Sequence, residues 1–312
     1  MTLDSFPVIG IALALGSALV LALGNLSQSR AVRSGGGGPS AGLRASEFRR
    51  LLTNGWWLVG ALLLGASIVL QLASLAFAPL IVVQPVGVAA LLFAAVFAAV
   101  GARAMPSWAT IRALLVCVAG VGAFVTVAAG VSVQRTIHDE QLIAILGALA
   151  IALVAVGALL LAGRRRRLPP IAFVLLGGVM SGFVVTLGKT VILRVQTALH
   201  HATVRIDETN LLTVGCAVGI LAAGALSVYL VQTAHTANRP EVVVAGLTVV
   251  DPLVAVVLAI AILREAAGAP VWAIAAFAAA GAIAILGVFL LSRASERAAD
   301  AAIAAAGGRG GG

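Results

Sequence analysis

The chain has 312 residues, of which 62% are hydrophobic and only 10% are charged. Soluble domains average roughly 45–50% apolar and about 25% charged residues, so this chain has too little polar sequence to cover a soluble fold. The net charge is +9, but the arginines cluster in short segments between apolar runs, as in the loops of membrane proteins. The composition therefore predicts an all-α integral membrane protein and argues against nucleic acid as a partner.

Nine apolar stretches reach the length of about 20 residues that a helix needs to cross a bilayer. The first resembles a signal-peptide core, but Asp4 precedes it and Arg30 follows it, which is the reverse of signal-peptide flanks. We therefore expect it to be retained as a helix. The predicted spans are 7–29, 56–77, 80–101, 108–130, 142–162, 171–193, 210–234, 241–263 and 270–292.

Arginines gather in alternate loops. The loop 30–55 holds five of them, and the loop after the fifth span contains Arg164, Arg165, Arg166 and Arg167. Cytoplasmic loops carry an excess of Lys and Arg, so these loops are predicted to face the cytoplasm. Nine crossings then place the N-terminus outside and the C-terminus inside a multi-pass protein of the cell membrane, with the lipid bilayer as its surroundings.

Short matches recur in the same order in two parts of the chain. Residues 1–130 form a first half of four helices with a Gly-rich linker at 34–46, residues 140–292 form a second half of five, and 293–312 form a cytoplasmic tail. The matches are Gln71 with Gln232, Pro79 with Pro240, Gln84-Pro85 with Asp251-Pro252, and Pro106 and Trp108 with Pro270 and Trp272. An offset of five spans orients the copies oppositely, and such inverted repeats place a binding site near the bilayer midplane.

Two runs carry a family resemblance. The run Val249–Glu265 resembles the Pro-Leu…Glu helix of the drug/metabolite transporter (EamA-like) superfamily, and Ala78–Gly87 is similar to its NIPA-like magnesium transporter branch. The resemblance covers about residues 7–292 and implies a carrier whose cavity is lined by spans 1, 2, 3, 5, 7 and 8. The chain departs from the pattern where Arg103 stands near the first-half counterpart of Glu265.

Only Asp251 and Lys189 carry charge well inside the predicted spans. Because a charge at membrane depth costs about 2.5–3.5 kcal/mol, each is a candidate functional residue. Asp251 is predicted to bind substrate or a proton, with a purely structural bond as the alternative, and Pro252 is expected to loosen the helix beside it. For Lys189 three interpretations stay open: a pair with Asp251, a contact with an anionic substrate group, or snorkelling to the outer surface.

Uncharged polar residues in the spans complete the candidate substrate site. They are Gln71, Gln84, Gln232, Tyr229 and Asn25. These groups can bind a polar solute or bond one another across helices. The patterns Gly178–Gly182 and Gly215–Gly219 allow close helix contact, either within one molecule or in a homodimer.

The chain has no nucleophile elbow, Walker loop or HExxH motif, and His200-His201 is too little for a metal site, so we expect neither an enzyme nor a resident metal or cofactor. The preferred hypothesis is a secondary transporter that moves a small polar or amphipathic metabolite by alternating access, with proton coupling left open. The alternatives are a magnesium or other divalent-cation permease and a membrane scaffold without a transport role.

Overall fold

The computed structural model describes residues 6–34, 54–102, 107–134, 137–163, 168–200, 208–238 and 240–307. Within these ranges all regular secondary structure is helical, and nine segments are long and apolar enough to cross a membrane. This confirms the predicted all-α membrane bundle. The arginine loop 164–167 and the linker from residue 35 onward lie outside the described residues. The helices are α1 (Pro7–Ser34), α3 (Gly55–Phe77), α4 (Leu80–Val86), α5 (Ala89–Ala102), α6 (Trp108–Val131), α7 (Asp139–Gly163), α8 (Pro170–His200), α9 (Glu208–Ala237), α10 (Pro240–Ala261) and α11 (Val271–Gly307).

The third predicted span is divided into α4 and α5. Pro85 lacks a backbone N–H, and the next two residues bond three positions back, Gly87 to Gln84 at 3.1 Å and Val88 to Pro85 at 3.2 Å. These tighter turns replace the regular helical bonds, so the helix is interrupted between α4 and α5.

Pro252 has no such effect on α10, which is continuous from Pro240 to Ala261. The expectation that Pro252 loosens the helix beside Asp251 is therefore wrong. The reason is packing, because a Cβ built on Gly182 of α8 would lie 2.7 Å from the Cβ of Val254. A Cβ built on Gly178 would likewise lie 2.7 Å from the Cβ of Val250, so α8 packs closely on α10 on both sides of the proline.

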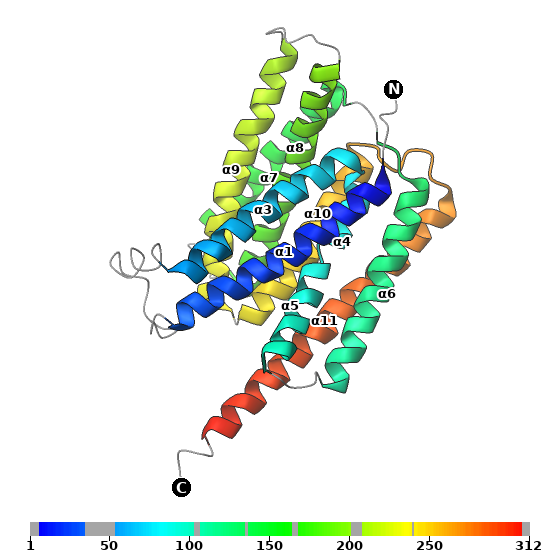
Figure 1. Ribbon diagram of the computed structural model, residues 1–312. Coiled ribbons are helices and arrows are strands. Elements are labelled where there is room, and N and C mark those ends of the chain that lie inside the picture. The colour runs from blue at the N-terminus through cyan, green and yellow to red at the C-terminus, as the bar shows by residue number, and fades with distance from the viewer. Residues whose placement is uncertain are drawn as a thin grey trace.

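The two halves repeat one pattern of helix contacts. The helix α1 packs on α3 and on α4 and α5, while α8 packs on α9 and on α10; α6 contacts α4 as α11 contacts α10. Across the interface, α6 packs on α11 and α4 on α10, and Figure 1 shows the α6–α11 pair side by side. This is the arrangement expected of two repeats related by a two-fold axis, with α7 as the additional helix.

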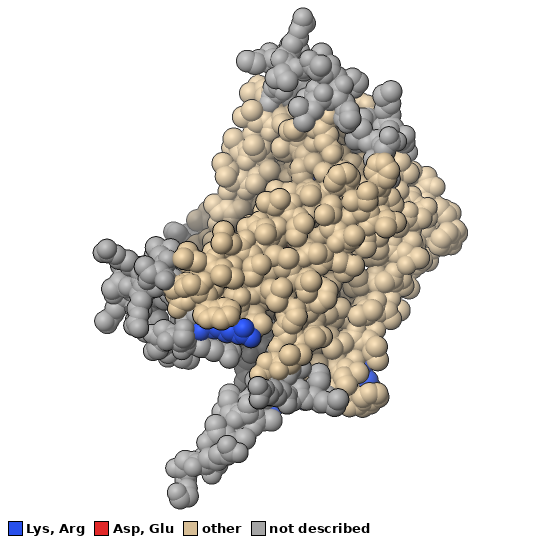
Figure 2. Space-filling model, in the orientation of Figure 1, with Lys and Arg blue, Asp and Glu red and all other residues tan. Residues whose placement is uncertain are grey.

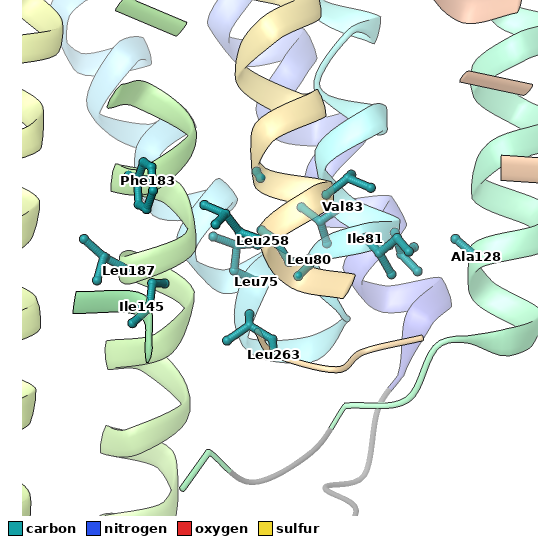
Figure 3. Packing of buried hydrophobic residues seen from close by; sticks show 14 of the residues in the cluster. Leu75, Leu80, Ile81, Val83, Ala128, Ile145, Phe183, Leu187, Leu258 and Leu263 are labelled. Atoms are coloured by element: carbon teal, nitrogen blue, oxygen red, sulfur yellow. The ribbon is translucent and has the colours of Figure 1, made fainter. Parts of the chain in front are cut away.

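The bundle has an apolar exterior, and part of its buried hydrophobic core lies at the end where α3 meets α4. The face in Figure 2 is almost entirely uncharged, and its few Lys and Arg side chains lie at the lower rim. We call the opposite end, where α3 gives way to α4, the upper end (Figure 1). There Leu75 of α3, Leu80 of α4, Leu258 of α10 and Leu263 of the following loop lie together (Figure 3), and each is less than a tenth exposed.

Candidate functional site

Asp251 lies at the middle of α10 and faces α8. Its Oδ2 accepts a hydrogen bond of 2.8 Å from the hydroxyl of Ser181. Its Oδ1 is buried and has no hydrogen-bond partner in the described part of the chain. A buried carboxylate oxygen without a donor costs free energy, which a ligand donor, a cation or a proton would recover. Asp251 is therefore a polar group available for binding.

Gln84 occupies the first-half position that matches Asp251. Like Asp251, it has a buried polar atom without a hydrogen-bond partner in the described part of the chain. It is 6% exposed, and its Nε2 is buried without a partner among the described residues. The prolines that follow Gln84 and Asp251, Pro85 and Pro252, line one pocket of about 80 Å³ between α4, α6, α10 and α11. Ligand pockets usually measure about 300–1,000 Å³, so this one must widen before it takes a metabolite.

The other residues of the predicted substrate site are not brought together. Gln71 is half-buried on α3, whereas Gln232 on α9 and Asn25 on α1 are exposed. Tyr229 is 58% exposed and lines a groove between α7, α8 and α9 that does not reach the central pocket. None of the predicted substrate residues lines the central pocket itself, and only Gln84 and Asp251 are followed directly by a residue that does, Pro85 and Pro252.

Lys189 is fully buried on α8, so the interpretation as a snorkelling residue is wrong. Its ammonium donates to the carbonyl oxygens of Leu75 and of Ala78, the latter at 2.7 Å, and to Oε1 of Gln134 at 3.2 Å. Asp251 is bound instead by Ser181, which precedes Lys189 by about two helical turns, roughly 12 Å along α8. The two charges do not pair.

Glu265 supplies the opposite charge at the same place. It is 2% exposed in the loop after α10, and its two carboxylate oxygens accept from the backbone N–H groups of Leu80 and Ile81, each at 2.9 Å. N–H groups in the first turn of a helix have no partner within that helix, and Pro79, which precedes α4, forms no side-chain cap for them. Glu265 supplies the missing acceptor. An anion at a helix N-terminus is favoured by the helix dipole.

Together these side chains hold the junction between α3 and α4 from both sides. Lys189 binds the carbonyl end of α3, Glu265 binds the amide end of α4, and Gln134 donates to the carbonyl of Ala76 at 3.3 Å while it accepts from Lys189. We call Lys189, Gln134 and Glu265 the α3–α4 clamp. Gln196 adds a bond of 3.3 Å to the same Ala76 carbonyl.

Sequence reasoning named Glu265 only as the acidic end of the Val249–Glu265 run and did not single out Gln134, so it placed neither residue in a site. One signal for Glu265 was present, because a helix that begins after Pro79 inside an apolar bundle needs an acceptor from elsewhere. Burial raises the pKa of the Glu265 carboxyl above its ordinary value, while Lys189 and the N–H groups of Ile81 and Leu80 lower it in part.

Known proteins offer no assignment for this arrangement. No family model, curated protein or solved structure matches the chain. Among the described residues, no three His, Cys, Asp or Glu side chains come together as a group that could hold a metal ion. The site is therefore interpreted from its own geometry.

Proposed function

We propose that the protein is a secondary transporter that moves a small polar or amphipathic metabolite by alternating access. One observation carries the proposal: a buried amide and a buried carboxylate, Gln84 and Asp251, each with an unsatisfied atom, stand at matching positions in two repeated halves. The proline that follows each of them lines one pocket at the contact between the halves. Transporters built from inverted repeats bind their substrates at such contacts, and rocking of one half against the other exposes the site to each side in turn.

Asp251 is the group through which we propose proton coupling. A charged side chain at membrane depth costs about 2.5–3.5 kcal/mol, and Asp251 meets no cation in the described part of the chain. Taking up a proton or a cationic substrate group removes that cost, and releasing it restores the cost. If Asp251 takes up a proton on one side of the membrane and releases it on the other, the rate of transport depends on the pH gradient.

The test is uptake into proteoliposomes that contain the purified protein. A panel of small polar and amphipathic metabolites, with Mg²⁺ in a separate arm, is offered with and without an inwardly acidic or alkaline pH gradient. We expect one class of metabolite to enter in a protein-dependent way and its rate to follow the gradient. Mg²⁺ flux alone, with no metabolite uptake, would favour a cation permease instead.

The matched control compares two carboxylates. The ion pair of Asp139 with Arg194 lies away from the pocket, at the start of α7. Asp251→Asn should abolish gradient-driven uptake, whereas Asp139→Asn should leave it close to the wild-type rate. Equal loss of uptake in both variants would show that any lost acid impairs the protein, and would contradict a special role for Asp251.

A further inference from the structure

The two ends of the bundle differ in a way that two-fold symmetry does not allow. At the upper end α3 of the first half packs on α8 of the second half. The counterparts of these helices are α9 and α1, which make no comparable contact. If both ends were equivalent, both pairs would touch or neither would. The described structure is therefore closed more tightly at its upper end.

The clamp explains the difference residue by residue. Leu23-Gly24-Asn25 in α1 matches Leu187-Gly188-Lys189 in α8, so Asn25 stands where α8 has its lysine. Lys189 is buried and bound to α3, whereas Asn25 is exposed. The lysine of the upper end is therefore part of a buried closure, whereas the residue that matches it in α1 is not buried.

The clamp also shares its helices with the central site. Ser181 and Lys189 both lie on α8, and Asp251 and Glu265 lie on α10 and the loop that follows it. A shift of α8 against α10 at Asp251 would therefore move Lys189 and Glu265 relative to the α3–α4 junction. The Glu265 backbone strengthens the connection, because its carbonyl accepts from Val133 N at 2.8 Å.

Closure by such charges is reversible for a physical reason. Each ion gives up its water to enter the closed state, and in exchange it binds backbone groups that would otherwise be unsatisfied. When the end opens, water can bind both the ions and the backbone groups of α3 and α4. The closed and open states therefore differ less in free energy than the number of hydrogen bonds alone would suggest.

We propose that the α3–α4 clamp is the gate of the upper end, and that it closes this end of the central pocket during transport. The clamp grips the helix junction of one half with charges from the other half, so its release frees the two halves to separate there. The proposal rests on the proposed transport function, because it assigns the regulation of access to the same central site.

The experiment measures access of a membrane-impermeant thiol reagent from the upper side. Ala259→Cys is the reporter, since Ala259 is fully buried on α10 and its carbonyl accepts from the N–H of Glu265 at 3.1 Å. The background carries Cys117→Ala and Cys216→Ala, which removes both native thiols. We expect slow labelling in the otherwise wild-type protein and labelling faster by about tenfold or more in Lys189→Met and in Glu265→Met.

A double variant guards against misfolding of the single variants, and a matched control variant shows the effect of losing a different ion pair. Lys189→Met with Glu265→Met leaves no unpaired charge, so it should fold where a single variant fails, and it should still label quickly because the junction has lost its caps. Arg194→Met removes the nearby Arg194–Asp139 ion pair without touching the junction, and it should label at the wild-type rate.

Two results would overturn the gate. One is labelling of the double variant at the wild-type rate. The other is an equal rise in the labelling rate at Ala113→Cys, a fully buried position near the lower end of α6, which would indicate general loosening.

Metabolite uptake by the wild-type protein is measured separately. Fast labelling without uptake would therefore refute the transporter and keep the clamp as a closure, whereas uptake without the labelling change would refute the clamp alone.

Discussion

Replacement of Asp251 by Asn should stabilise the folded protein while it removes coupled transport. A charge at the bilayer centre costs about 2.5–3.5 kcal/mol. The single hydrogen bond from Ser181, 2.8 Å long, returns about 1.5–3 kcal/mol of this, since its acceptor is charged. The carboxylate therefore destabilises the fold by about 1 kcal/mol. Asn removes the charge, its Oδ1 can still accept from Ser181, and its Nδ2 replaces an oxygen that already lacks a partner among the described residues, so the cost of the charge is what the substitution changes.

The assay is thermal unfolding of the purified protein in detergent, with uptake measured on the same preparations. For a chain of this size, about 1 kcal/mol raises the Tm by roughly 2 °C. Ser181→Ala serves as the control of opposite sign, because it removes the donor and leaves the charge without any bond. A fall in Tm of several degrees in Asp251→Asn would show that the carboxylate is a structural bond and would refute the functional interpretation.

Three other predictions address packing, pH and orientation. Gly182→Val should destabilise the protein by about 1–3 kcal/mol in unfolding assays because its Cβ meets Val254, whereas Gly188→Ala, with nothing within 4 Å, should be tolerated. Since burial raises the pKa of Glu265, the closed state binds its proton more tightly than an open, hydrated state. Acidification should therefore slow labelling of the upper-end reporter relative to the lower-end position, and Glu265→Gln should remove that dependence. Faster labelling in acid would contradict this prediction. In intact cells, single cysteines at positions 166 and 305 should resist impermeant reagents, and labelling of either one from outside would contradict the cytoplasmic assignment.

The spans could be predicted because bilayer thickness fixes the length of an apolar helix. Span limits such as 56–77 and 108–130 agree with α3 and α6 to within a residue or two. The repeat was visible in short matches because equivalent helix junctions keep their proline and polar residues. The break after Pro85 and the continuity of α10 through Pro252 were not predictable, since the difference depends on the glycine contacts of α8 with α10.

The candidate site was predicted in part. Asp251 and Lys189 were singled out because charges in apolar spans are costly and therefore informative, and their role in binding stays a prediction. Their separation could not be read from the sequence, since it depends on which carbonyl groups the α3–α4 junction presents to Lys189. Glu265 looked like an ordinary loop charge because a residue outside the spans carries no such cost until a loop folds inward. Tyr229 and Gln232 were predicted to line the site but are exposed. The polar stripe that they form on the helix did not fix which side of the helix faces the interior.

Counterflow in proteoliposomes tests alternating access most directly. Vesicles are preloaded with the unlabelled metabolite that gives the highest uptake, and entry of the labelled compound is followed with no net gradient of pH or voltage. A carrier that exposes one site to each side in turn should accumulate label transiently and exchange it faster when unlabelled compound is present on the opposite side. Entry at a rate that ignores the compound on the opposite side would contradict alternating access and would indicate a channel-like permease.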